Sequence, residues 1–158
     1  QGVDKVSLDE LLTESNCVIV ATPYTQETHH IIGPGALAKM RSDAVLVCVS
    51  RGKCVDNRAL YNALNSRVIS AAAVDDPEEE PMKMDSWSPS NNPLFTLDNF
   101  FCTPHTAYIS TGALAECRRT AAENVKSVLL GQRPWDLFLP SGVAMDRPLR
   151  AGFSAKRS

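Results

Sequence analysis

The stretch Ala44-Val-Leu-Val-Cys-Val-Ser-Arg-Gly52 decides the fold, because six apolar residues follow one another and end at a turn. Three more short, largely apolar runs lie along the chain, at Cys17–Ala21, Val68–Val74 and Phe100–Cys102. Runs that are continuous rather than alternating are typical of strands covered on both faces of a parallel sheet. The sequence therefore predicts four buried parallel strands.

Helix-like segments separate the four runs. Ser7 and Asp56 are residue types that cap helix N-termini, Pro34 suits a first turn, and Gly131 suits a helix stop. The apolar residues of the last and longest segment fall on one stripe, which predicts a helix that packs in the core. The alternation predicts βαβ units with right-handed crossovers, and hence an open α/β sheet. The predicted helices are Leu8–Glu14, Pro34–Met40, Asn57–Asn65 and Thr111–Leu130.

Composition narrows the class of protein. The chain has 158 residues and a formal net charge of −2, from 16 Lys+Arg and 18 Asp+Glu, which argues against a nucleic-acid partner. No apolar run approaches the roughly 18–20 residues that a membrane span needs. Five cysteines without a C-x-x-C pair fit a reducing cytoplasm better than a disulfide framework. Because it starts with Gln1 rather than Met, we expect the chain to be part of a longer protein.

Polar residues follow the strands where ligands of open α/β sheets bind, beyond the carboxyl ends. They include Arg51, Asp75 and His105. The planar guanidinium of Arg51 suits a carboxylate, and His105 can exchange a proton near neutral pH. A carboxylate beside that histidine would favour the imidazolium form. Such a set of residues could bind a small anion and reduce its carbonyl group.

An ordered series of short motifs resembles the C-terminal part of the D-isomer-specific 2-hydroxyacid dehydrogenases, a family that includes phosphoglycerate and D-lactate dehydrogenases and the C-terminal-binding-protein corepressors. The resemblance covers about residues 7–140. It implies the second half of a Rossmann-type doubly wound parallel sheet, ending in a long helix. Residues 1–133 would form a partial NAD-binding domain, and 134–158 a return segment with a disordered tail. The motifs are Ser7–Leu12, Thr22-Pro23, Glu27–Ile32, Leu37–Met40, Ser50–Gly52, Ala72–Asp75, Glu80-Pro81, Asn92–Leu94, Leu97–Asn99 and Thr103–His105.

The resemblance also implies roles for individual residues. Arg51 would bind the substrate and act in catalysis, His105 would be the acid/base, and Glu80 would be the carboxylate that pairs with His105. The expected cofactor is NAD, the expected substrate a 2-keto acid or 2-hydroxyacid, and the expected assembly a homodimer through this domain. Residues expected near NAD are Thr22, Thr25, Val49, Ser50, Arg51, Asp75, His105 and Tyr108.

The chain departs from the family at several positions. Asp76-Pro77 stands where the family often has Val or an aromatic residue. Glu80 is selected from the run Glu78–Glu80 by spacing alone, which leaves Glu78 and Glu79 as a solvated face. The sequence contains no G-x-G-x-x-G fingerprint, which in the family lies upstream and cradles the pyrophosphate. The identity of the 2-keto acid and the choice of NAD over NADP therefore stay open.

Three alternatives accompany this reading. Tyr108 stands where the corepressor branch often has Trp, which favours an NAD(H)-sensing interaction protein. A truncated fragment without activity of its own, binding NAD weakly or not at all, is also compatible with the missing fingerprint. His29-His30 invites a metal site, but adjacent histidines are expected to point apart and have no suitably spaced partner, so we predict none.

Overall fold

The computed structural model describes residues 2–76, 78 and 92–134, grouped into two units, 1–107 and 108–158. The residues predicted to form a disordered tail lie outside the described part from position 135 onward. In chain order the elements are α1 (Leu8–Glu14), β1 (Cys17–Val20), α2 (Pro34–Lys39), β2 (Val45–Cys48), the 3₁₀ turn η1 (Gly52–Cys54), α3 (Asn57–Asn65), β3 (Ala71–Val74), the 3₁₀ turn η3 (Pro93–Thr96), β4 (Phe100–Cys102) and α4 (Thr111–Leu129).

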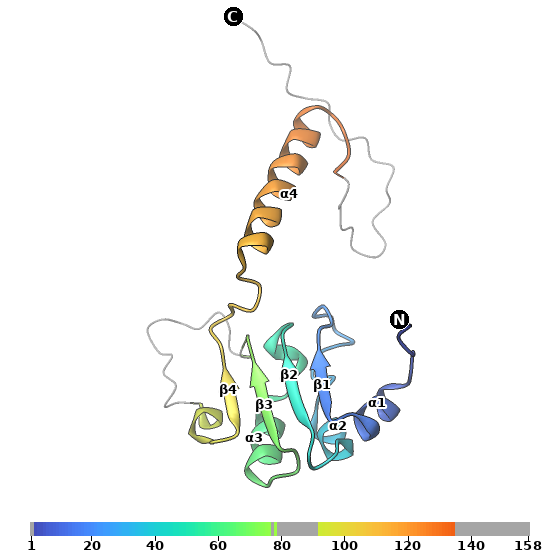
Figure 1. Cartoon of the computed structure of the whole chain (residues 1–158), viewed down its shortest axis with the longest axis vertical. Helices are drawn as coiled ribbons and strands as arrows, with labels where there is room; N and C mark the ends of the chain where they lie inside the picture. The colour runs from blue at the N-terminus through green and yellow to red at the C-terminus, as the bar shows by residue number, and fades with distance from the viewer. Residues whose placement is uncertain (1, 77, 79–91, 135–158) are drawn as a thin grey trace, which may run out of the picture. The chain divides into compact units, whose positions relative to one another are not determined.

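The four strands form one parallel sheet in the order β1-β2-β3-β4. Cys17 pairs with Val45, Val45 with Ala71, and Ala72 with Phe100. All four carboxyl ends therefore meet at one edge of the sheet, where the arrowheads lie in Figure 1. The predicted open α/β sheet is confirmed, and each predicted strand contains an observed one.

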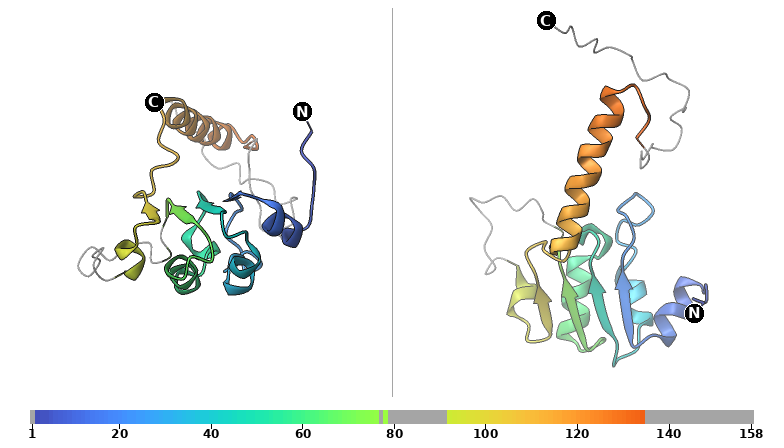
Figure 2. Two further views of the ribbon diagram at one scale, coloured as in Figure 1. Left: turned by 60° about the horizontal axis from the view of Figure 1, so that its bottom comes forward. Right: turned by 45° about the horizontal axis from the view of Figure 1, so that its top comes forward.

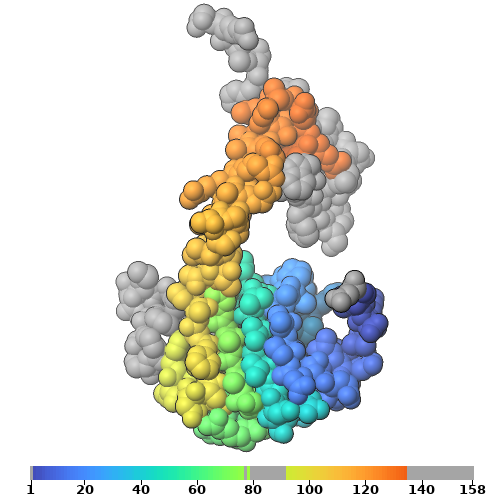
Figure 3. Space-filling model, in the orientation of Figure 1, coloured from blue at the N-terminus to red at the C-terminus, as the bar shows by residue number. Residues whose placement is uncertain are grey.

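Helices α2 and α3 cover one face of this sheet (Figure 2, left). Buried residues alternate with more exposed ones along β1, and Ile19 and Phe101 are 63% and 64% exposed. The strands appear as adjacent bands of colour on the surface in Figure 3. In the first unit α2 and α3 therefore cover one face, and the exposed Ile19 and Phe101 belong to the other. Coverage of that second face stays a prediction, because a continuous apolar run does not reveal which elements cover it.

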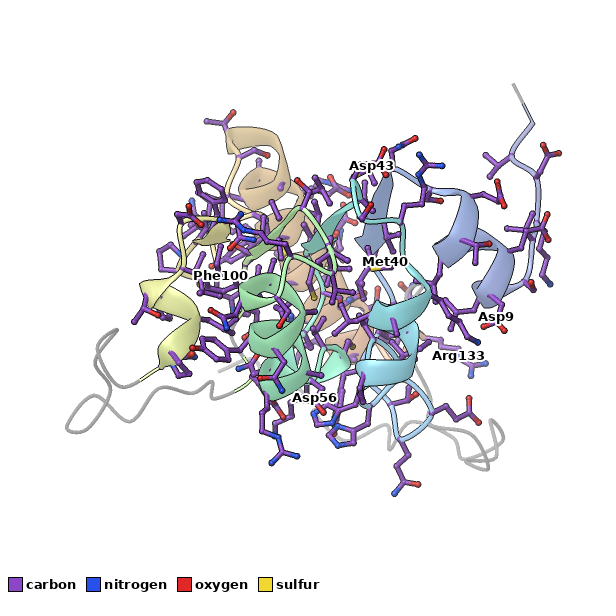
Figure 4. All side chains as sticks on the ribbon, turned by 90° about the horizontal axis from the view of Figure 1, so that it is seen from below. Asp9, Met40, Asp43, Asp56, Phe100 and Arg133 are labelled. Atoms are coloured by element: carbon purple, nitrogen blue, oxygen red, sulfur yellow. The ribbon has the colours of Figure 1, made fainter. Side chains whose placement is uncertain are left out.

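The core lies between the sheet and these helices. Its largest fully buried side chains include Leu12, Leu37, Leu46, Leu60 and Leu64. At the edge of the core the ring of Phe100, labelled in Figure 4, packs edge-on against Phe95 with centroids 5.6 Å apart.

The predicted helix caps are confirmed in the first unit. Ser7 Oγ accepts a hydrogen bond from Glu10 N at 3.2 Å, and Asp56 Oδ1 accepts one from Ala59 N at 2.9 Å. Figure 4 labels Asp56 at the start of α3. The cap fixes where α3 begins, and so limits the length of the loop that connects β2 to α3.

Helix α4 belongs to the second unit. Ser110 caps it by accepting a hydrogen bond from Ala113 N, and Gly131, with φ of +69°, follows its end as predicted. None of its residues is buried within the described structure, and its packing in a core stays a prediction. Among the described residues no helix combines the length and apolar character needed to cross a membrane.

Candidate active site

Arg51 lies in the loop between β2 and α3, directly before η1. An isolated parallel bridge between Ile32 and Val55 connects the end of this loop to the segment between β1 and α2. Ile32 N donates to Cys54 O and Asp56 N donates to Ile32 O, each at 3.1 Å. The backbone that follows Arg51 is therefore fixed to the β1–α2 segment. The Arg51 side chain itself is 57% exposed.

His105 lies in the turn that follows β4 and has a left-handed backbone, with φ of +53°. A non-glycine residue adopts this region infrequently, although histidine is one of the types that tolerate it. Its N–H donates to Asp75 O at 2.6 Å and to Thr103 O at 3.0 Å. These bonds hold the turn closed and position the half-buried imidazole at the sheet edge.

The structure brings Arg51 and His105 together across 54 positions of sequence. Arg51 Nη1 lies 3.4 Å from His105 Nε2 and also donates to Ser50 O at 3.2 Å. A permanent cation that binds oxygen anions thus lies beside a group that can exchange a proton. An acid with a carbonyl next to its carboxylate would place the carbonyl oxygen within reach of both.

Asp75 anchors the turn that carries His105. Its Oδ1 accepts hydrogen bonds from Thr103 Oγ1 at 2.5 Å and Thr106 N at 2.8 Å, and its Oδ2 accepts one from Ala107 N at 2.9 Å. Burial alone would raise the pKa of this carboxyl, but the three hydrogen bonds and the nearby His105 outweigh burial and hold the pKa below its ordinary value.

Protonation of Asp75 is therefore expected to loosen the turn from Thr103 to Ala107. Because the pKa is depressed in the folded state, these hydrogen bonds contribute fully above the ordinary aspartate pKa of about 3.9. Their contribution is lost as the pH falls through the lower folded-state pKa. In an NMR titration the amide signals of Thr106 and Ala107 should move together in that acidic range. Signals that stay fixed until the whole chain unfolds would contradict the anchoring role.

Two of the residues predicted to lie near NAD, Val49 and Ser50, are found at the same edge of the sheet. Val49, an apolar side chain that is 46% exposed, follows β2, and half-buried Ser50 comes next. Thr22 and Thr25 are exposed beyond β1, and Thr25 N donates to Thr28 Oγ1 at 2.7 Å, which shapes that loop.

Two further predicted site residues lie outside the described part of the first unit. Tyr108 belongs to the second unit and is 58% exposed. Glu80, expected to pair with His105, lies outside the described residues.

Glu78 makes contacts that sequence reasoning missed. Its Oε1 lies 2.7 Å from His30 Nε2, and its Oε2 accepts a hydrogen bond from Asn57 N at 3.3 Å. With 26% of its side chain exposed, Glu78 is not a member of a solvated face as predicted. It ties the segment after β3 to the first turn of α3, and no local pattern signals a contact across 48 positions.

His29 and His30 stack with centroids 3.9 Å apart, so the expectation that they point apart is wrong. The cause is the left-handed backbone of His30, with φ of +51°, which breaks the side-to-side alternation of an extended chain. Within the described parts of the chain, no group of three or more His, Cys, Asp or Glu side chains could hold a metal ion.

Comparison with known proteins identifies the family of this chain. The family model described as "D-isomer specific 2-hydroxyacid dehydrogenase, NAD binding domain" matches residues 1–107. A glyoxylate reductase of Korarchaeum cryptofilum is 39% identical over 136 residues, which cover 86% of this chain and 39% of that protein. The chain thus spans well under half the length of this relative.

Solved structures are similar over the same extent. An acyclic imino acid reductase (Bsp5) in complex with NADPH and D-Arg has a TM-score of 0.74 and 30% identity, over 85% of this chain and 40% of that one. A D-lactate dehydrogenase from Aquifex aeolicus, complexed with NAD and lactic acid, has a TM-score of 0.72 and 33% identity, over 80% and 40%. The chain belongs to the D-isomer specific 2-hydroxyacid dehydrogenase family, in which it represents part of the Rossmann-type NAD-binding domain.

Proposed function

We propose that this chain supplies the catalytic arginine and histidine of an NAD-dependent oxidoreductase that interconverts a 2-oxo acid and a D-2-hydroxy acid. The observation that carries the proposal is the 3.4 Å separation of Arg51 Nη1 and His105 Nε2 at the carboxyl edge of the sheet. A protein that only bound nucleotide would have no need of an exposed guanidinium beside an acid/base imidazole.

Arg51 binds and polarises the substrate in this proposal. Its guanidinium offers several N–H donors in one plane, which match the carboxylate and the adjacent carbonyl oxygen of a 2-oxo acid. As the carbonyl is reduced, negative charge develops on its oxygen. A fixed cation at that oxygen stabilises the transition state more than the ground state, which lowers the barrier.

His105 supplies the proton. In its imidazolium form, Nε2 donates to the carbonyl oxygen while the electron pair of the C=O bond moves onto that oxygen. When bound, NADH supplies the hydride that C2 receives. The products are then the 2-hydroxy acid and neutral His105, and in the reverse direction the neutral imidazole accepts the hydroxyl proton.

The remaining residues have supporting roles in the proposal. Val49, Ser50 and Asp75 are proposed to line the nicotinamide end, and Thr22 and Thr25 the adenosine half. Tyr108 is proposed to contact the cofactor as well. Glu80 is proposed to pair with His105 and so to favour its imidazolium form.

Turnover of 2-oxo acids by the complete gene product tests the proposal. Glyoxylate and pyruvate are each offered with NADH, and the loss of NADH absorbance is followed. We expect reduction of at least one of them with kcat in the usual enzymatic range of about 1–10³ s⁻¹. Acetaldehyde, which has a carbonyl but no carboxylate for Arg51, serves as the control and should be a poor substrate. Tight NADH binding without turnover of any 2-oxo acid would contradict the proposal and favour an NAD(H)-sensing role.

We also propose that the protein works as a cytoplasmic homodimer. All five cysteines are free, which suits a reducing compartment. Exposed apolar side chains, such as Ile19 and Phe101, leave surface that association would bury. Sedimentation velocity of the complete gene product should give twice the mass of one chain.

A further inference from the structure

Two consecutive aspartates, Asp75 and Asp76, follow the strand at the centre of the site. Strand β3 lies between β2, which leads to Arg51, and β4, which leads to His105. Successive side chains of an extended backbone point in opposite directions. Asp75 accordingly bonds the turn after β4, whereas Asp76 faces the loop after β2.

Asp76 is a buried carboxylate next to an exposed guanidinium. Its side chain is 4% exposed, and its Oδ2 lies 3.8 Å from Nε of Arg51, whose side chain is 57% exposed. Acidic side chains are rarely buried this deeply unless they are paired, because leaving water costs several kcal/mol. The buried Asp76 is therefore the less mobile member of the pair. The ion pair orients the long and exposed side chain of Arg51.

The contacts of Arg51 divide its guanidinium into two sides. Nε faces Asp76, while Nη1 contacts His105 Nε2 and Ser50 O. The guanidinium is planar, so fixing Nε also fixes the plane in which the terminal nitrogens lie. With Nε turned toward the carboxylate at ion-pair distance, the edge of the guanidinium that carries the terminal nitrogens faces His105, where an anion can bind.

We propose that Asp76 is a positioning residue that holds Nε of Arg51, so that the terminal guanidinium nitrogens meet the substrate beside His105. The inference rests on the proposed function. It also accounts for the residue type at this position, since the valine or aromatic residue frequent in the family could not attract Nε. Asp75 and Asp76 together align the acid/base and the anion-binding group from one strand end.

The first test is a double-mutant cycle in the complete gene product. Asp76→Asn keeps the shape of the side chain and removes its charge, and we expect kcat/KM for the preferred 2-oxo acid to fall about tenfold. In an Arg51→Leu background the same substitution should have almost no further effect, because its target is gone. An equal loss in both backgrounds would mean that Asp76 acts only on stability, and no loss in either would overturn the inference.

Asp98→Asn is the matched control. Asp98 also pairs with an arginine, Arg67, at 2.8 Å, but this exposed pair precedes the amino ends of β3 and β4, at the other end of the strands from the site loops. Its substitution should leave kcat/KM unchanged. If Asp98→Asn lowers activity as much as Asp76→Asn does, the effect is one of general charge and not of Arg51 orientation.

A second readout does not depend on turnover. The side-chain Nε–H signal of Arg51 in an NMR spectrum can be assigned by its disappearance in Arg51→Leu. We expect Asp76→Asn to shift this signal and to speed its exchange with water, and an unchanged signal would overturn the inference. If Arg51→Leu leaves turnover intact while Asp76→Asn shifts the Nε–H signal of Arg51, the proposed function is wrong. The contact between Asp76 and Arg51 is then still supported.

Discussion

Replacement of His105 by asparagine is expected to lower kcat for 2-oxo acid reduction by about 10²–10⁴, the range that positioned acid/base groups usually contribute. Asparagine is the suitable substitute because residue 105 has φ of +53°, and asparagine tolerates left-handed backbone better than most residues. The turn should therefore keep its hydrogen bonds to Asp75 O and Thr103 O. What the variant loses is the group that donates the proton.

The measurement is steady-state kinetics across a range of pH. KM should change little, since the main anchor of the substrate is Arg51, and the pH dependence of kcat that comes from the imidazole should disappear. His29→Asn provides the control, because His29 is an exposed histidine of the β1–α2 segment with no proposed part in the reaction. A variant of His105 that keeps more than a third of the original kcat would remove this residue from the mechanism.

Replacement of Arg51 by leucine should lower kcat/KM by about 10²–10³, which is the usual effect of removing a donor to a developing oxyanion. Both the binding of the carboxylate and the polarisation of the carbonyl are lost, so KM should rise and kcat should fall. Arg51→Lys should recover only part of the loss, because an ammonium group lacks the planar fork.

A measurement of thermal stability distinguishes the loss of the Arg51 side chain's function from unfolding of the variant. The Arg51 side chain is 57% exposed, but Arg51→Leu leaves the buried carboxylate of Asp76 without this ion-pair partner, so a moderate fall in Tm is expected. The variant should still be fully folded at the assay temperature, which its circular dichroism spectrum checks. Arg58→Leu, at an exposed position on α3, is the control and should retain full activity. Equal activity losses in both arginine variants would contradict a specific role for Arg51.

The fold could be predicted from the sequence because its signals are local. Ser7 and Asp56 bond to backbone groups three residues away, and each strand is a short apolar run. The pairing of Arg51 with His105 followed from topology, since parallel strands bring their carboxyl ends to one edge. The motif series then identified the same two residues by resemblance.

The remaining features depend on contacts between distant positions. Glu78 meets His30 across 48 positions, and nothing in the run Glu78–Glu80 indicates which glutamate turns inward. The stacking of His29 on His30 depends on one left-handed backbone angle, which no residue type near it demands. The exposure of Ile19 and Phe101 could not be predicted, because apolar strands look alike whether their partner helices are near or far.

The sequential order of the parallel strands has a consequence for how the chain folds. Each strand pair, such as Cys17 with Val45 or Ala72 with Phe100, closes a loop of about 27 residues, and no hairpin can form first. Such non-local pairing slows folding relative to helical bundles of similar size. During synthesis β1 emerges before β2, so the edge of β1 that β2 covers in the folded sheet stays unpaired until β2 arrives. Pairing of β2 with β1 therefore competes with association between nascent chains through the same unpaired edge.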